Sequence, residues 1–250
     1  GRITLDGYCD TCSIATQHGD MEPNPIGPAA PLARAQSQPS GQRRHVLHLF
    51  SGTHGEFKKA GLLAGLEVTE IDIAIDGTDL SNPTIQRLLE AEVLEGKYEA
   101  ILIGTPCASF SVALAADGHA GAILRSWAHP DGLPDLKGAN ADKLQRHNAL
   151  VDFTARIAAI QVRTHGELII ENPPSRADPA SHAYWPARAH MPPLWATSAI
   201  ASLFAAAQRA GWPLRIREAP QCAFGRNPAG LLFQKWSAFA MTPGAAASVA

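Results

Sequence analysis

From His45 onward, short apolar runs alternate with segments of helical periodicity, and this alternation restricts the fold most. The first run, VLHLF (46–50), stops at Ser51-Gly52, as a buried strand does before a turn. Further strands are expected at 67–75, 98–104, 167–174, 213–218 and 230–236. Helices are expected at 56–64, 83–94, 141–162 and 200–210. Such alternation predicts an α/β fold with a mainly parallel sheet and helices on both faces.

The chain is predicted to have three parts. Residues 1–44 are expected to form a disordered tail, because the stretch 21–41 is rich in Pro, Ala, Ser and Gln and shows no sustained period. Residues 45–240 are expected to form the α/β domain, and residues 241–250 a flexible C-terminal end. A chain of 250 residues is long enough for one such domain and a tail.

Charge and cysteine content restrict the class of function. The formal net charge is -2, so contact with nucleic acid would have to be local. No apolar run has the length of a membrane span, and no membrane partner is expected. The pair Cys9 and Cys12 is compatible with a metal site completed by His18, or with two free thiols. Because nothing suggests a disulfide scaffold, a reducing, intracellular compartment is favoured.

The first strand-to-helix turn, HLFSGTHGE, is the candidate cofactor site. Small residues allow a ligand to approach the backbone closely, and a helix start offers free amide groups. The turn lacks the G-x-G-x-x-G spacing, so a dinucleotide is only weakly indicated. Glu70 or Asp72, at the end of the second strand, is expected to hold ribose hydroxyls, and Asp79 an adenine amino group. Each acid taken alone is more commonly a solvated loop charge, but the order of these acids after such a turn favours the functional interpretation.

Two further turns follow strands of the same sheet. In GTPCASFS, Cys107 comes directly after Pro106, and in IENPP the strand ends at Glu171. Ligands of open α/β sheets bind beyond the carboxyl ends of the strands, so the three turns are expected to meet in one crevice. There Cys107 is a candidate nucleophile, although free Cys is commonly an inert core residue. Glu171 is a candidate donor to a ring nitrogen, or alternatively a cap on the next segment.

The succession VLHLFSG, EID, Asp79-Leu80, YEAILIGTPCASFS and LIIENP resembles the core of C5-cytosine DNA methyltransferases. That family has D-L-F-S-G, E-x-D, G-D-I, G-P-P-C-Q-x-F-S and E-N-V in this order. The resemblance covers roughly residues 45–235. It implies a Rossmann-like class I methyltransferase fold, S-adenosyl-L-methionine as the cofactor, and DNA as the partner.

The resemblance also implies roles for individual residues. The positions implied at the cofactor are Phe50, Ser51, Gly52, Glu70, Asp72, Asp79, Leu80 and Pro106. Of these, Phe50 and Gly52 would line the methionine and adenosine part, Glu70 would hold the ribose hydroxyls, and Asp79 would hold the adenine amino group. Cys107 would attack C6 of a flipped-out cytosine, and Glu171 would contact N3. Arg215, Arg217 or Arg226 would stand in for an arginine that the family carries on a late strand, and Arg226 in CAFGRNP is the best placed of the three.

Several positions depart from the family pattern, and two other readings stay open. His48 and His54 replace Asp and Gly, Thr105 and Ala108 replace Pro and Gln, and Pro173 replaces Val. No target-recognition region is evident. One alternative is an amino-group methyltransferase that acts on adenine N6 or cytosine N4, because Asn172-Pro173-Pro174 resembles an N-P-P turn, with Ser175 in place of its aromatic residue. The other is a degenerate, non-catalytic cofactor- or DNA-associated domain of a mobile element.

Overall fold

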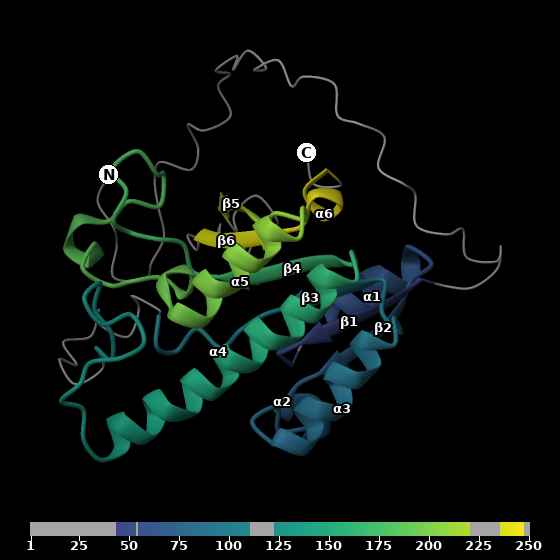
Figure 1. The fold of residues 1–250 in the computed structure, drawn as a ribbon, viewed down its shortest axis with the longest axis horizontal. Helices are drawn as coiled ribbons and strands as arrows, with labels where there is room; N and C mark the ends of the chain where they lie inside the picture. Colours follow the sequence, from purple (N-terminus) through teal and green to yellow (C-terminus); the bar gives the residue numbers. More distant parts are fainter. Residues whose placement is uncertain (1–43, 54, 111–122, 221–235, 248–250) are drawn as a thin grey trace, which may run out of the picture. The chain divides into compact units, whose positions relative to one another are not determined.

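A six-stranded sheet with the order β2-β1-β3-β4-β6-β5 forms the centre of the computed structural model (Figure 1). The structure describes residues 44–53, 55–110, 123–220 and 236–247. The strands are β1 His45–Leu49, β2 Glu67–Ile71, β3 Ala100–Ile103, β4 Glu167–Asn172, β5 Arg215–Pro220 and β6 Trp236–Met241. The expected α/β fold with a mostly parallel sheet is confirmed.

The register of the sheet brings several strand ends to one edge. β1 pairs in parallel with β2 and β3, so that Leu49 lies opposite both Ile71 and Ile103. β3 also pairs in parallel with β4, whereas β6 runs antiparallel to β4. The chain therefore leaves β1, β2, β3 and β4 at the same edge, which is the carboxyl edge of the sheet.

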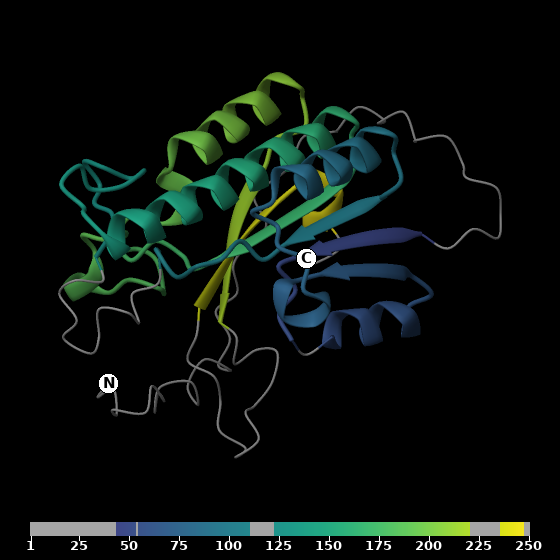
Figure 2. The same ribbon diagram turned by 90° about the horizontal axis from the view of Figure 1, so that it is seen from below.

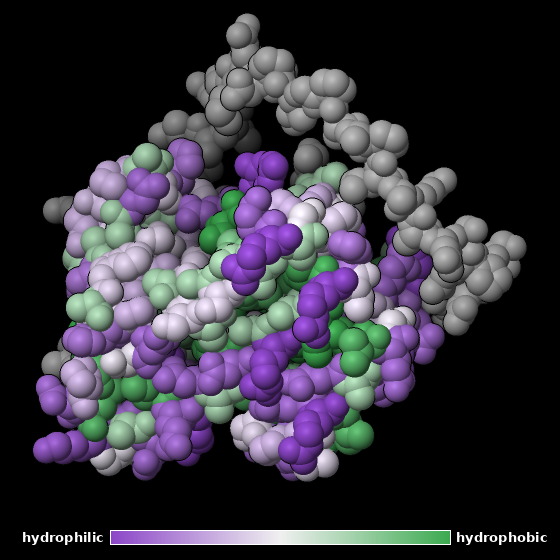
Figure 3. Space-filling view, viewed as in Figure 1, coloured by the Kyte–Doolittle hydropathy of each residue, from purple (hydrophilic) through white to green (hydrophobic). Residues whose placement is uncertain are grey.

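Helices lie on both faces of the sheet (Figure 2). Their bounds are α1 Glu56–Leu63, α2 Ile73–Asp76, α3 Pro83–Leu94, α4 Ala139–Arg163, α5 Ser198–Arg209 and α6 Pro243–Ala247, with 3₁₀ turns at Pro186–Arg188 and Leu194–Ala196. On one face α4 packs between α3 and α5, and α1 lies on the opposite face. Figure 3 views the α3–α4–α5 face, where hydrophilic residues alternate with apolar patches.

The main core lies between the sheet and the α3–α4–α5 layer. Leu47 and Leu49 of β1 and Ile103 of β3 are completely buried there, together with Phe153 and Ile157 of α4. Leu47 and Leu49 are two positions apart on a strand, and Phe153 and Ile157 are four positions apart on a helix, so each pair shares one buried face. Because apolar residues at these spacings are buried together, the apolar runs of the sequence predicted these elements well.

Most boundaries differ from the sequence prediction by a few residues, and the differences at the second strand and at the C-terminal end are the most informative. The second strand ends at Ile71 rather than at 75, because Asp72 caps the short helix α2 by accepting a hydrogen bond from the Ala74 amide. The last strand begins at Trp236, and the predicted range 230–235 lies outside the described residues. Within the predicted C-terminal end, 241–250, Met241 belongs to β6 and residues 243–247 form α6. The predicted tail lies outside the described residues, apart from Arg44.

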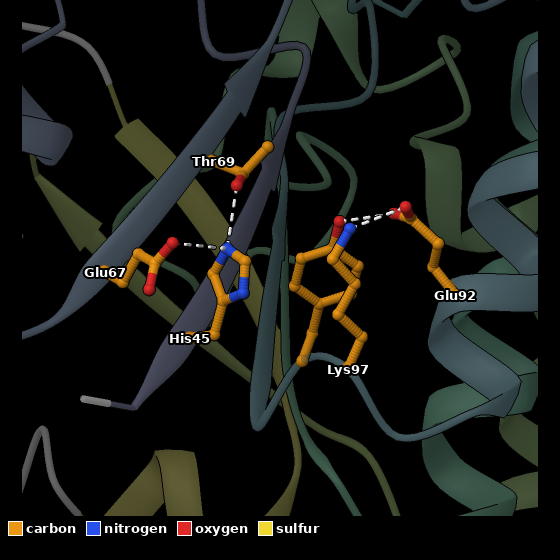
Figure 4. Close-up of polar contacts among 6 residues, drawn as sticks. His45, Glu67, Thr69, Glu92 and Lys97 are labelled. Atoms are coloured by element: carbon orange, nitrogen blue, oxygen red, sulfur yellow. Dashed lines mark hydrogen bonds and ion pairs between the residues drawn. The ribbon is translucent and has the colours of Figure 1, made fainter. Parts of the chain in front are cut away.

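A polar cluster lies at the opposite, amino edge of the sheet (Figure 4). His45 Nε2 lies 2.8 Å from Thr69 Oγ1 and 4.0 Å from a Glu67 carboxylate oxygen. Lys97 and the Tyr98 hydroxyl both donate to Glu92, each at 2.6 Å. Burial and the bond to Glu92 raise the pKa of Tyr98. The cluster joins the starts of β1, β2 and β3, and it is separate from the edge that carries the predicted site.

Among the helices that the structure describes, none is long and apolar enough to cross a membrane.

Candidate functional site

A cavity of about 330 Å³ opens at the carboxyl edge of the sheet. The strand order reverses at β1, with β2 on one side and β3 on the other, and this switch point is where open α/β sheets bind ligands. The residues that line the cavity come from the turns after these three strands and from α4: Phe50, Gly52, Asp72, Ile73, Thr78, Asp79, Leu80, Gly104, Pro106 and Leu150. The structure thus brings six of the predicted cofactor residues together around one cavity.

The turn after β1 has an unusual backbone conformation. Phe50 has φ of 55°, in the left-handed region that non-glycine residues seldom adopt, and its amide donates to the Ile71 carbonyl. Its own carbonyl oxygen packs against Gly104, where a Cβ atom would lie only 2.9 Å away. Contacts with β2 and with Gly104 accompany this conformation, and backbone strain of this kind is typical of functional sites.

The structure separates the two acids that the sequence left open for the ribose. The Asp72 carboxylate borders the cavity and accepts from the Gly52 amide at 2.9 Å. Glu70 is not among the lining residues; its side chain is 6% exposed and accepts from the Lys58 amide at the start of α1. Asp72 is therefore the acid that a ligand in the cavity would meet, and Glu70 supports α1.

His48, which departs from the family pattern, lies next to Glu70. Its Nδ1 atom is 3.6 Å from a Glu70 carboxylate oxygen, and its ring contacts Phe57 edge-on at 4.9 Å. Burial lowers the pKa of His48, against the opposite effect of Glu70 and Asp72. His48 therefore forms part of the packing beneath α1.

Three other predicted cofactor residues differ in their environments. Asp79 borders the cavity and accepts from the Ser81 amide at 2.8 Å, and hydrogen bonds to Ser81 lower the pKa of Asp79. Leu80 is buried beside it. Ser51 does not line the cavity, and its buried hydroxyl has no hydrogen-bond partner within the described ranges. The cavity thus presents two carboxylates and apolar walls.

Cys107 lies in a closed turn next to this cavity. The preceding residue, Pro106, lines the cavity, and Cys107 itself is a free, half-buried thiol. The Phe110 amide donates to the Cys107 carbonyl at 2.8 Å, which closes the turn. The Thr105 hydroxyl lies 3.1 Å from that of Thr154 on α4. These contacts hold the thiol at the carboxyl edge.

Glu171 is linked to the same edge from β4. It is half-buried, and its Oε1 atom accepts from the Ser237 hydroxyl of β6 at 2.6 Å. Its neighbour Asn172 is completely buried and donates through Nδ2 to the Thr105 carbonyl at 2.8 Å. We call residues 104–110, which carry Cys107, the thiol turn, and residues 171–175, which begin at Glu171 near the end of β4, the carboxylate turn. A direct hydrogen bond, from Asn172 to Thr105, joins these two turns.

Sequence reasoning did not identify Ser237 or the structural role of Asn172. Ser237 is 66 residues from Glu171 along the chain, and no periodicity relates two positions so far apart. Ser237 also lies one residue beyond the predicted last strand, 230–236, so its place on β6 was not predicted. Arg226, Cys9, Cys12 and His18 lie outside the described residues.

The remaining polar residues do not assemble a metal site in the part of the chain that the structure describes. Across those residues, no group of three or more His, Cys, Asp or Glu side chains is arranged to hold a metal ion.

A scan against protein-family models and a search of curated proteins found no match to this chain.

Proposed function

We propose that this protein is an S-adenosyl-L-methionine-dependent methyltransferase that methylates C5 of cytosine in DNA through Cys107. One observation carries the proposal. Pro106 borders the cavity formed by Gly52, Asp72 and Asp79, so that the thiol turn directly adjoins a small-molecule pocket. The Asn172–Thr105 hydrogen bond ties the Glu171 turn to the same place.

The arrangement of the sheet supports this proposal. A class I methyltransferase fold requires a mainly parallel sheet with a switch point beside its first strand. Here the order β2-β1-β3-β4-β6-β5 has its switch point at β1, and β6 is antiparallel to β4 near the far edge. Both features are expected of that fold.

The chemistry of the cavity suits the cofactor. Its volume of about 330 Å³ lies within the usual range for small-molecule sites. In the proposal Asp72 accepts hydrogen bonds from the ribose hydroxyls, and Asp79 accepts one from the adenine amino group. Gly52 has φ of 71°, and the absence of a side chain leaves its surroundings open to a ligand.

The reacting groups are assigned as follows. The Cys107 thiolate would form a bond to C6 of the cytosine, and the carboxyl form of Glu171 would donate to N3 as the C5–C6 electron pair moves into the ring. The bound cofactor would supply the methyl group to C5 and would leave as S-adenosylhomocysteine. Transfer of the C5 proton to water would then allow the bond between sulfur and C6 to break, which would restore the thiolate and the aromatic ring.

One feature weighs against the amino-group alternative. An N-P-P turn would have to offer the Asn172 side chain to the substrate amine. Asn172 is completely buried, which closes its side chain off from a substrate amine. Its Nδ2 atom donates to the Thr105 carbonyl, and its Oδ1 atom has no hydrogen-bond partner among the described residues. The third interpretation is a domain that binds the cofactor or DNA but transfers no methyl group. The methyl-transfer assay described next distinguishes it from the proposal.

The experiment is incubation of the full chain with DNA and methyl-labelled S-adenosylmethionine, followed by analysis of the modified base. The proposal expects 5-methylcytosine, and complete loss of product in Cys107→Ala. Calorimetry on the same two proteins checks that cofactor binding is retained. Label in N6-methyladenine or N4-methylcytosine would overturn the proposal in favour of the amino-group reading. Cofactor binding without any transfer would favour the non-catalytic one.

A further inference from the structure

A buried arginine lies directly behind the thiol turn. Arg125 is only 2% exposed, and it is the largest of the fully buried side chains in the described residues. Burial lowers the pKa of Arg125 to about 10, with a smaller opposing effect from Asp131, so that it stays protonated at neutral pH. A buried charge is costly unless its surroundings compensate it closely.

Neutral acceptors from three segments contact the guanidinium. Nε donates to the Ser109 hydroxyl at 3.2 Å, one terminal nitrogen donates to the Pro130 carbonyl at 2.7 Å, and the other donates to Asn148 Oδ1 at 2.7 Å. The guanidinium also lies over the Phe110 ring, 4.3 Å from its centroid. None of these contacts within the described part is with a carboxylate.

Two of these contacts reach the thiol turn. Ser109 and Phe110 follow Cys107 closely in the chain, and the Phe110 amide donates to the Cys107 carbonyl. The other two contacts connect the guanidinium to the Pro130 carbonyl and to α4, which carries Asn148. Asn148 also donates to the Asp131 carbonyl. Asp131 in turn accepts from the Ser198 amide at the start of α5.

The segment around Arg125 is itself closed. Ser126 and His129 form an isolated antiparallel bridge, and the Leu133 amide donates to the Leu124 carbonyl at 2.9 Å. Arg125 is thus held in a tight loop on one side and by α4 on the other. The thiol turn packs against this fixed cation.

We propose that Arg125 is a positioning residue for Cys107, which holds the thiol turn through Ser109 and Phe110. The inference rests on the proposed role of Cys107 as the nucleophile. A planar guanidinium can donate in three directions and stack on an aromatic ring at once, whereas a lysine ammonium cannot reproduce that geometry. The three acceptors around the guanidinium are neutral, so they fix its orientation through hydrogen bonds rather than through an ion pair.

Arg125→Lys in the full chain tests the proposal, because it keeps the charge and removes the planar fork. Arg156→Lys is the matched control. Arg156 also lies on a ring, that of Phe153, and donates to Glu90 and Gln86, but it is a surface residue of α4 away from the thiol turn. Each variant is examined for thermal unfolding, cofactor binding, methyl-transfer kinetics and the alkylation rate of Cys107 by iodoacetamide, read on the Cys107 peptide by mass spectrometry.

We expect Arg125→Lys to lower kcat about 100-fold, the size of effect that a displacement near 1 Å can cause, with an unchanged KM for S-adenosylmethionine. We also expect faster alkylation of Cys107, because the half-buried thiol becomes accessible when its turn is released. Arg156→Lys should change neither quantity. Wild-type kcat and alkylation rate in a folded Arg125→Lys protein would overturn the inference.

The alkylation assay separates this inference from the proposed function. If the wild-type protein transfers no methyl group, the proposed function is wrong. The alkylation rate of Cys107 would then decide by itself whether Arg125 positions the thiol turn. If Arg125→Lys does not fold, Ser109→Ala replaces it, because that change removes only the contact between Nε and the turn. Ser109→Ala is expected to accelerate the alkylation of Cys107, and an unchanged rate would overturn the inference.

Discussion

The side-chain amide of Asn172 donates to the main-chain carbonyl of Thr105 across a distance of 2.8 Å. This bond joins the end of β4 to the turn that carries Cys107. It links two segments 67 residues apart and lies in the completely buried interior. The bond makes the thiol turn and the carboxylate turn one structural unit.

Replacing Asn172 with Ala tests this unit. The change leaves the Thr105 carbonyl buried without its donor, and we expect the free energy of unfolding to fall by about 1–3 kcal/mol. Urea denaturation measures the loss. Gln208→Ala on the exposed face of α5 is the control and should stay within about 0.5 kcal/mol of wild type. Equal stability of Asn172→Ala and wild type would show that the bond contributes nothing.

The two acids near the end of β2 should differ in their effect on cofactor affinity. Asp72→Asn removes a charged acceptor that borders the cavity, and it should weaken binding of S-adenosylmethionine by about 10- to 100-fold, as lost hydrogen bonds to charged groups do. Glu70→Gln should weaken binding much less, since Glu70 lies beneath α1. Calorimetry on both variants measures the affinities. A larger loss for Glu70→Gln would reverse this assignment.

Ser237 should affect turnover rather than cofactor binding. Its hydroxyl donates to Glu171 Oε1 at 2.6 Å and fixes the orientation of the carboxyl group. We expect Ser237→Ala to lower kcat about tenfold, the equivalent of one hydrogen bond of roughly 1.4 kcal/mol, with little change in the KM for S-adenosylmethionine. Ser237→Thr keeps the hydroxyl and should restore most of kcat. Equal rates for the Ala and Thr variants would contradict this role.

His147 should make the stability of the fold depend on pH. Burial, with the positive charges of Lys143, Arg125 and Arg146, lowers the pKa of His147 to about 4. The unfolded chain therefore binds a proton between about pH 6.5 and pH 4 that the folded chain does not, so stability contributed by neutral His147 falls as the pH falls through this window.

Urea denaturation at pH 7 and pH 4.5 measures this dependence. After allowance for solvent screening of a half-buried group, the effect of His147 is roughly 1–2 kcal/mol. His147→Gln should reduce the difference between the two pH values by this amount, whereas His129→Gln, at an exposed position, should not. An unchanged pH dependence in His147→Gln would exclude His147 as its source.

Local sequence patterns were enough to predict most of the elements. Pro83 marked the start of α3, and the run ILI within 98–104 marked β3, because turn chemistry and burial period act over a few residues. The same reasoning failed at Asp72. Extended runs such as EVTEIDIAI do not show which acid ends the strand and caps the next helix.

The candidate site was predicted only in part for a related reason. The turns at Gly52, Cys107 and Glu171 were recognisable, since each follows an apolar run and carries unusual residues. Their supporting partners were not, because Asn172–Thr105, Ser237–Glu171 and Arg125–Asn148 are contacts between distant segments.

The sequence by itself determined the alternation of strands and helices and the identity of the three turns. The tertiary structure decided that Asp72 rather than Glu70 borders the cavity, because the register of β1 with β2 places Asp72 beside the Gly52 amide. It also decided the place of Arg125, which composition alone would put at the surface. Pairing register and long-range burial depend on the whole packed chain, and a local pattern of residues does not contain them.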